Sequence, residues 1–226
     1  MQINTEIASV VKPDSPGAAI TFAMRSKIYN KLASEINLES VGNILDIGVT
    51  PDADAAYSNF FECVYPYKDR ITALSDQNAE CLEKLFPGLK FVQGDGRKLP
   101  FADNTFELVI SSAVIEHVGA YENQKKFIEE ALRVSSRYVF INTPNRWHIF
   151  EFHTYFPFLH WLPKKWHRAI LNIFKLHYLA KEENLNLLDK NTLKKICREL
   201  GINCNISFVR FIGMPSNLLL FIEKKN

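Results

Sequence analysis

The sequence has few cysteines, no long apolar run and no glycine-rich phosphate turn. Its four cysteines (Cys63, Cys81, Cys197 and Cys204) fall in no paired metal-ligand spacing, so we expect buried thiols in a reducing cytoplasm rather than a disulfide framework. Charge or proline interrupts every apolar run well short of a bilayer span. No charged segment followed by an apolar one opens the chain, so we expect no signal peptide and a cytoplasmic location.

The charges are distributed unevenly along the 226 residues. The net charge is +2, but residues 1–146 carry −4 and residues 147–226 carry +6. This asymmetry indicates either two surfaces with different tasks or only a bias that keeps the fold soluble, and both readings stay open. Hydrophobic residues make up 47% and charged residues 23%, which is typical of a globular protein with one substantial core.

Short apolar runs alternate with helical stretches up to residue 146. Such an alternation predicts crossover units and a parallel sheet. We expect strands at 43–48, 70–74, 89–92, 106–110 and 138–141, and helices at 19–36, 54–64, 77–86 and 122–133.

The pattern changes after Trp147. A helix is expected at 191–200, followed by Gly201 in the position typical of a helix end. Two apolar runs at 205–212 and 218–223, with turn residues at 213–217 between them, predict a terminal antiparallel hairpin.

Acidic residues follow the predicted parallel strands. The segments concerned are Asp46–Gly48, Ser75–Asp76, Gly94–Gly96 and Ser111–Glu116, and ligands of open parallel sheets bind at these strand ends. Asp52 and Asp54 occupy the first turn and would repel a phosphate, which argues against a dinucleotide site. A cationic nucleoside without phosphate fits better, because acids can bind its ribose hydroxyls and its adenine amine.

Together these segments resemble the class I S-adenosylmethionine-dependent methyltransferases, and most closely the small-molecule group called type 11. The resemblance is carried by Ile44–Gly48, Ile71–Asp76, Gly94–Phe101, Phe106–Val109, Ser112–His117 and Asn142–Asn145. It implies a Rossmann-like α/β fold with helices on both faces of a mostly parallel sheet. It also implies cofactor contacts from Asp46 and Gly48 at the methionine end, Ser75 and Asp76 at the ribose, Asp95 and Gly96 at the adenine, and Ser111, Ser112 and Ala113 beneath the amino acid moiety.

The sequence departs from the family pattern in three places. The first loop keeps only Gly48 and continues through Thr50, whose hydroxyl is a candidate replacement for a backbone contact. The acid expected at the end of the second strand falls on Ser75, with Asp76 one residue later, and Glu107 replaces the usual Asp of the fourth strand. The alternative to an enzyme is therefore a non-catalytic methyltransferase-like binding protein with a degenerate first loop.

Glu116 and His117 form the pair nearest the reaction in the enzymes that the sequence resembles. His117 would remove a proton from an acceptor hydroxyl as the methyl group arrives. The alternative is that the pair begins a helix and bonds to neighbouring backbone.

Aromatic residues concentrate between the fifth strand and the terminal strands. Residues 147–178 hold all three tryptophans, five of six histidines and ten of 28 aromatics. We expect a lid or substrate wall, with Arg146, Trp147, His148 and His153 nearest the active centre. Peripheral membrane contact and a lipid-like acceptor fit this composition, while a helical hairpin completing the core or a dimer contact is the alternative.

Two other kinds of ligand are disfavoured. His153, His160 and His167 recur every seven residues, but Pro157 and Pro163 interrupt a continuous helix, so we expect no metal. The near-neutral net charge also argues against nucleic acid.

The sequence therefore predicts one methyltransferase domain over residues 1–226. Its parts are a helical lead-in at 1–41, a cofactor-binding core at 42–146, an aromatic insertion at 147–190 and a terminal helix and strands at 191–226. The expected function is methyl transfer from S-adenosylmethionine to a small-molecule or lipid-like acceptor.

Overall fold

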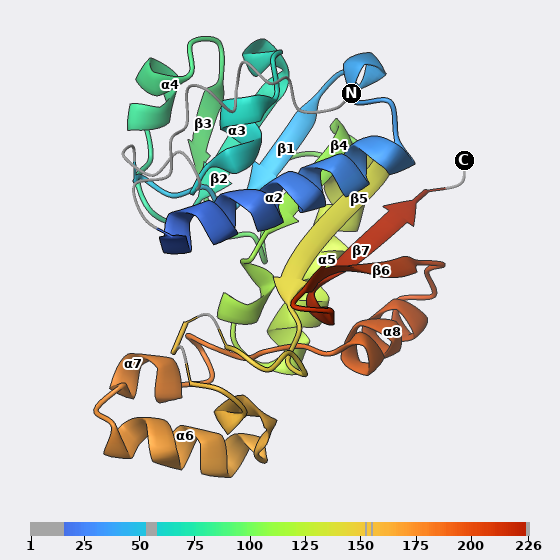
Figure 1. Cartoon of the computed structure of the whole chain (residues 1–226). Coiled ribbons are helices and arrows are strands. Elements are labelled where there is room, and N and C mark those ends of the chain that lie inside the picture. The colour runs from blue at the N-terminus through green and yellow to red at the C-terminus, as the bar shows by residue number, and fades with distance from the viewer. Residues whose placement is uncertain (1–15, 53–57, 152, 155, 225–226) are drawn as a thin grey trace.

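A seven-stranded sheet forms the centre of the protein (Figure 1). The computed structural model describes residues 16–52, 58–151, 153–154 and 156–224. The strand order is β3-β2-β1-β4-β5-β7-β6; the first five are mutually parallel, and β7 is antiparallel to both of its neighbours. The strands are β1 (Ile44–Ile47), β2 (Ile71–Ser75), β3 (Lys90–Gln93), β4 (Phe106–Ser112), β5 (Ser135–Pro144), β6 (Asn205–Phe211) and β7 (Met214–Glu223). The predicted Rossmann-like sheet with a terminal antiparallel hairpin is confirmed.

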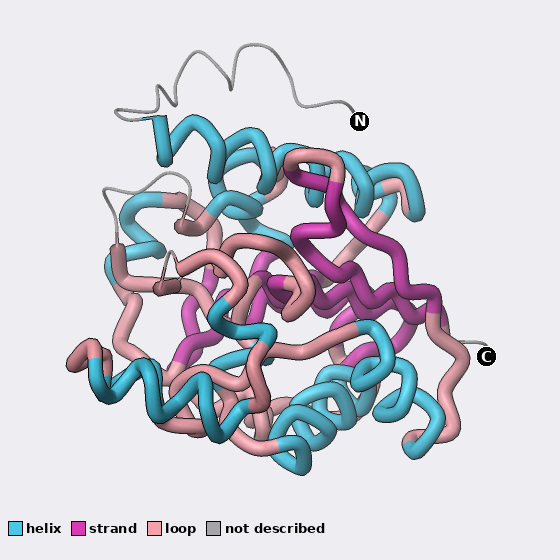
Figure 2. Tube along the Cα trace, turned by 60° about the horizontal axis from the view of Figure 1, so that its bottom comes forward, coloured by secondary structure: helices cyan, strands magenta, loops and turns pink. Residues whose placement is uncertain are grey.

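Helices cover both faces of this sheet, and Figure 2 shows the strands as a layer between them. One face packs against α2 (Pro16–Glu35), α3 (Phe60–Val64) and α4 (Cys81–Leu85). The other packs against α5 (Tyr121–Val134) and α8 (Lys190–Glu199). Short 3-10 turns complete this part of the fold: η1 (Leu38–Ser40), η2 (Lys68–Arg70) and η3 (Ile115–His117).

The central strand β1 is buried along its whole length, and its side chains alternate between the two faces, as the pleat requires. Ile44 belongs to the core on the α2 side, whereas Leu45 and Ile47 belong to the core on the α5 side. The alternation therefore directs Asp46 toward α2 and α3. This places an ionisable side chain in the core on that side of the sheet.

Two predicted helices differ from the observed ones. The first residues of the helix expected at 54–64 lie outside the described residues. Within the described part, the helix is α3, which begins at Phe60. The helix expected at 77–86 is observed only as Cys81–Leu85. Asn78 Oδ1 accepts a hydrogen bond from the Glu80 amide at 3.0 Å, so local side-chain bonding holds residues 78–80 in a turn.

The terminal hairpin turns earlier than predicted. The sequence indicated a turn at 213–217, but β7 already begins at Met214. Ile212 and Gly213 have φ of 49° and 75°, which is the backbone of a two-residue hairpin loop. Pro215 fits into β7 because it lies beyond the last pair with β5, beside the register shift between Val209 and Arg210.

The chain between β5 and α8 forms a small helical unit below the end of β5 in Figure 1. It contains η4 (Leu159–Trp161), α6 (Lys164–Ile173) and α7 (His177–Ala180). Asn145 and Leu188 pair as an isolated bridge, so the unit leaves and rejoins the sheet at neighbouring points. Among the described helices, none is both long and apolar enough to cross a bilayer.

Candidate active site

The candidate site lies where the strand order reverses. β1 pairs with β2 on one side and with β4 on the other, so the crossovers from β1 depart in opposite directions. The carboxyl ends of strands at such a point leave a crevice for ligands. Ser111 Oγ donates to the Ile47 carbonyl at 2.9 Å and ties the two strand ends together.

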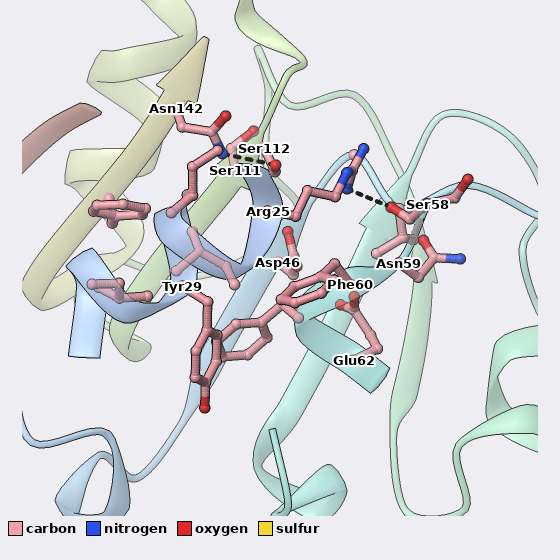
Figure 3. A pocket seen from close by; sticks show the side chains of 17 residues that line it. Arg25, Tyr29, Asp46, Ser58, Asn59, Phe60, Glu62, Ser111, Ser112 and Asn142 are labelled. Carbon is pink, nitrogen blue, oxygen red and sulfur yellow. Dashed lines mark hydrogen bonds between the residues drawn. The ribbon is translucent and has the colours of Figure 1, made fainter. Parts of the chain in front are cut away.

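A cavity opens on the α2 side of this point (Figure 3). It encloses about 570 Å³, including its part open to solvent. Four of the predicted cofactor residues line it: Asp46, Gly48, Ser111 and Ser112. The other lining residues are Arg25, Ile28, Tyr29 and Leu32 of α2, Val49, residues 58–62, Ile110, Phe140 and Asn142.

Asp46 and Glu62 form a buried, hydrogen-bonded carboxyl pair beside this cavity. Burial raises the pKa of Asp46 well above its ordinary value, and it also raises the pKa of Glu62. A second charge faces the pair from α2, where desolvation lowers the pKa of the Arg25 guanidinium while both carboxyls oppose that effect. Arg25 Nη1 donates to the Ser58 carbonyl at 3.0 Å. The cavity therefore presents a cation and an acidic pair within one small volume.

Gly48 has a backbone that other residues rarely adopt. Its φ is +97°, and an added Cβ would lie 2.1 Å from Val114 Cγ2. The Gly48 amide donates to the Leu74 carbonyl at 2.7 Å. Both the turn and the packing thus require glycine at this position.

The Thr50 segment is held by a side chain that the sequence analysis did not identify. Asn59 Oδ1 accepts from the Thr50 amide, and Asn59 Nδ2 donates to the Thr50 carbonyl, both at 3.0 Å. The Thr50 hydroxyl is buried without a hydrogen-bond partner in the described structure and does not line the cavity.

The residues expected at the ribose and the adenine lie at the next two strand ends. Gly94 donates to the Ser75 carbonyl at 2.8 Å, which joins the ends of β2 and β3. Ser75 is buried, Asp76 is exposed, and neither lines the cavity. Ser75 and Asp76 therefore lie at the same edge of the sheet as the cavity but do not form part of it.

Asp95 and Gly96 also lie outside the cavity. The Asp95 carboxylate pairs with Arg97 at 2.7 Å and accepts the Arg97 amide at 2.8 Å. These hydrogen bonds lower the pKa of Asp95. An added Cβ at Gly96 would lie 2.5 Å from Phe127 Cε2, so close core packing alone requires this glycine.

Ala113 changes the direction of the chain after β4. Its φ is +56°, a value that is uncommon for alanine, and its amide donates to the Asn142 carbonyl at 3.0 Å. Asn142 Nδ2 donates to Ser112 Oγ at 2.7 Å (Figure 3). The resulting bend leads into η3 and positions Glu116 and His117.

Glu116, His117 and His153 meet in one cluster, with ligand-type atoms all within 4.8 Å of one another. His117 Nε2 lies 3.1 Å from His153 Nε2 and 4.0 Å from Glu116 Oε1. Burial raises the pKa of Glu116. The predicted catalytic pair and one predicted substrate residue are therefore brought together.

The other three predicted substrate residues make contacts that hold the insertion. Arg146 donates to the Leu162 carbonyl at 3.1 Å, and Trp147 Nε1 donates to Asp189 Oδ2 at 3.1 Å. His148 is buried, with Nε2 3.3 Å from the Phe211 carbonyl. None of the three contacts the Glu116–His117–His153 cluster in these interactions.

Arg25, Asn59, Glu62 and Asn142 complete the site without having been identified as site residues from the sequence. Arg25 shares one face of α2 with the apolar side chains three, four and seven residues later, Ile28, Tyr29 and Leu32. A cation on such a face was the one available signal. Asn59 and Glu62 lie within 54–64, where the sequence predicted only a helix. Their roles depend on tertiary contacts.

Comparisons with known proteins agree with this geometry. Residues 45–138 match the family described as a methyltransferase domain. Norajmaline N-methyltransferase from Rauvolfia serpentina is 28% identical over 58% of this chain and 34% of its own length. Phthiotriol/phenolphthiotriol dimycocerosates methyltransferase from Mycobacterium leprae is 29% identical over 47% of this chain and 38% of its own length. The matches thus span little more than a third of these curated relatives.

A solved structure extends the likeness across the fold. The S-adenosylmethionine-dependent methyltransferase from Aquifex aeolicus superposes with a TM-score of 0.57 at 16% identity, covering 97% of each chain. The family match covers β2 to β4, nearly all of β1 and most of the residues that line the cavity. The lining residues of α2 and β5 lie outside it. This chain therefore has the fold of the solved methyltransferase and matches a methyltransferase domain over residues 45–138.

Proposed function

We propose that this protein transfers the methyl group of S-adenosylmethionine to an oxygen, nitrogen or carbon atom of a small or lipid-like acceptor. The observation that carries the proposal is the charge pattern of the cavity, where Arg25 faces the Asp46–Glu62 pair. The methionine end of the cofactor is an amino acid with one ammonium and one carboxylate. A guanidinium and a carboxyl pair match these groups.

This match indicates which residues contact each group of the cofactor. Arg25 binds the carboxylate, and the Asp46–Glu62 pair accepts from the ammonium. Gly48 permits close approach of the backbone at the same point. The ribose and adenine then extend along the sheet edge toward Ser75, Asp76, Asp95 and Gly96. Because the Asp95 carboxylate is paired with Arg97, binding at Asp95 requires that part of this ion pair is broken.

The acceptor approaches from the aromatic insertion. Nine of the fourteen exposed large apolar side chains in the described structure belong to residues 147–178. Trp166, Ile173 and Tyr178 are 67%, 76% and 69% exposed, and Lys164, Lys165 and Lys175 lie on the same segment. Aromatic and basic side chains together suit an anionic lipid surface, so we propose that the insertion contacts such a surface and receives a lipid-like acceptor there.

Calorimetric titration with S-adenosylhomocysteine tests the cofactor assignment. The wild-type protein should bind one equivalent, and Arg25→Gln should bind at least about tenfold more weakly, because it loses a charge-assisted contact. Lys27→Gln is the matched control, since Lys27 is an exposed cation on the same helix. Equal affinity in Arg25→Gln would reject the role of Arg25, and no binding by the wild type would reject the function.

Transfer is tested separately with cofactor carrying a labelled methyl group. The protein is incubated with aqueous and lipid extracts, and labelled products are identified by mass spectrometry. We expect label in the lipid fraction that disappears in Asp46→Asn. Binding without transfer to any fraction would instead favour the non-catalytic alternative.

A further inference from the structure

In the Glu116–His117–His153 cluster, the ring protons of both histidines lie on the nitrogens that face away from the cluster. The nitrogens that face each other are therefore available to bind a cation. His117 Nδ1 lies 2.6 Å from the Asn184 carbonyl. A carbonyl oxygen only accepts hydrogen bonds, so His117 Nδ1 carries the proton. His153 Nδ1 is hydrogen-bonded to the Glu151 carboxylate, which fixes its proton in the same way. When both rings are neutral, two lone pairs face each other across the 3.1 Å between the Nε2 atoms.

Glu116 supplies a third atom that can bind a cation. A proton shared between the two histidines would not give this atom a hydrogen-bond partner. Its side chain is completely buried. Thr143 Oγ1 donates to Oε2 at 2.8 Å, which holds the carboxylate in place. Oε1 is left without a hydrogen-bond partner in the described structure and lies 4.0 Å from His117 Nε2. A buried, unpaired carboxylate oxygen is costly unless something binds it.

The surroundings have the form of a metal site's outer contacts. Metal-binding histidines usually donate their second ring N–H to a carboxylate or a backbone carbonyl, which fixes the tautomer and aims the other nitrogen. Asn184 and Glu151 make these two contacts here. The Asn184 segment is itself anchored, because the Asn186 amide donates to the Glu116 carbonyl at 2.7 Å.

The distances agree with binding to a common ion. Two nitrogens each at about 2.1 Å from a metal stand about 3.0 to 3.4 Å apart for octahedral to tetrahedral angles. The histidine nitrogens already have this separation at 3.1 Å. Glu116 Oε1 lies 4.0 Å from His117 Nε2 and within 4.8 Å of His153 Nε2, so it has to move closer to both to share one ion with them. Two imidazoles and one carboxylate suit zinc or iron(II) better than magnesium or calcium.

We propose that Glu116 Oε1, His117 Nε2 and His153 Nε2 bind one divalent transition-metal ion, for which zinc is the reference probe. The sequence analysis expected no metal, because it considered His153, His160 and His167, a set whose spacing Pro157 and Pro163 interrupt. It did not consider Glu116 and His117 as metal ligands. The three ligands leave coordination positions open for an oxygen of the acceptor. That use of the open positions rests on the proposed methyl transfer, whereas metal binding itself does not.

The experiment measures metal binding by untagged protein that has been dialysed against a chelator. Zinc is titrated calorimetrically, and cobalt(II) is followed by its visible absorption, which reports nitrogen and oxygen ligation directly. We expect one equivalent per chain. His117→Ala and His153→Ala should each weaken binding by about 100-fold, and Glu116→Gln by about tenfold, because each removes one ligand. His177→Ala is the control, since His177 is exposed and contacts Asn172 instead.

Urea unfolding of each variant shows whether it is folded, independently of any cofactor binding. Unchanged zinc affinity in the His117→Ala, His153→Ala double variant would overturn the proposal. So would the absence of stoichiometric binding by the wild type, together with a nitrogen NMR spectrum showing a protonated His153 bridging to His117. Failure of methyl transfer alone would leave the metal-binding result intact.

Discussion

At the scale of single residues, the site is defined by side chains whose charges do not fit an apolar core. Asp46 points into the core because the pleat of β1 directs it there, and Glu62 of α3 lies against it. Such a pair is stable only if it shares a proton or gains an opposite charge. Arg25 supplies part of that charge, and a bound ammonium would supply more. Under the proposed function, the two carboxyl groups that are unfavourable to bury would thus recognise the ammonium of the cofactor.

Gly48 offers a residue-scale test of the first loop. Gly48→Ala should lower the free energy of unfolding by about 1 to 3 kcal/mol, because it strains a positive φ and places Cβ against Val114. Urea denaturation measures the loss. Adding Val114→Ala should recover the steric part but not the backbone part. An unchanged unfolding midpoint in Gly48→Ala would contradict the described loop geometry.

His167 offers a residue-scale test by pH. Desolvation lowers its pKa to about 4, opposed by Glu151 and reinforced by His160, Arg146 and Arg168. The unfolded chain protonates this histidine near pH 6.5, so stability is fully present above that pH and is lost as the pH falls toward 4. We expect the wild type to lose about 1 to 2 kcal/mol more than His167→Gln between pH 7 and pH 5.

The comparison uses urea unfolding of both proteins at the two pH values. His177→Gln, at an exposed position of α7, should lose as much stability as the wild type. Parallel losses in the wild type and His167→Gln would show that His167 does not resist protonation in the folded state.

At the scale of elements, α8 is fixed by one N-terminal side chain. Asp189 Oδ1 accepts from the Thr192 amide at 2.7 Å, and Asp189 Oδ2 accepts from Trp147 Nε1 at 3.1 Å. The residue therefore caps the helix and also holds the start of the insertion. We expect Asp189→Ala to destabilise the protein by about 1 kcal/mol or more, because the first turn loses its cap.

Asp189→Ser separates the two roles, since serine caps well but is too short to hold the indole. It should restore most of the stability measured by thermal unfolding, while tryptophan fluorescence still reports a released Trp147. Equal destabilisation by both substitutions would argue that the contact with Trp147, and not the cap, is the stabilising one.

The elements also show how far the sequence predicts the fold. All seven strands were predicted, because short apolar runs bounded by turns are a local signal. The hairpin turn was misplaced because Pro215 reads as a breaker locally, whereas its position beyond the pairing with β5 is a tertiary fact. The shortened helix at Cys81–Leu85 reflects a side-chain bond from Asn78 that no periodicity reveals.

The site was predicted in part for the same reason. Asp46, Gly48, Ser111 and Ser112 lie at or just beyond the carboxyl ends of β1 and β4 and were recognised from their order in the chain. Arg25 and Glu62 reach the cavity from helices, and their contacts with Asp46 depend on how those helices dock. Cofactor binding stays a prediction for all of these residues and for Ser75, Asp76, Asp95 and Gly96, as does the cytoplasmic location.

At the scale of the whole molecule, most of the exposed aromatic side chains lie at one end, on residues 147–178. Residues 147–190 also carry a net charge of +2, and the helical unit of α6 and α7 stands away from the sheet (Figure 1). This arrangement predicts binding to anionic vesicles that weakens as salt rises, because surface charges are screened.

Co-sedimentation with vesicles of anionic or neutral lipids measures this binding. Trp166→Ser with Ile173→Ser should reduce the bound fraction about tenfold or more, because both side chains lose apolar contact with the bilayer. Leu85→Ser, at a 45% exposed position on α4, is the control. Equal binding to neutral and anionic vesicles, or no binding, would contradict the proposed surface.

The bridge between Asn145 and Leu188 has an evolutionary consequence. The intervening chain begins and ends one strand spacing apart, and none of its described residues lines the cavity at the ends of β1 and β4. We expect such a segment to tolerate exchange for the corresponding segment of a relative, because the residues that line the cavity would keep their geometry. Under the proposed function, a new acceptor could then be taken by changing this one segment, together with the His153 contact that it supplies.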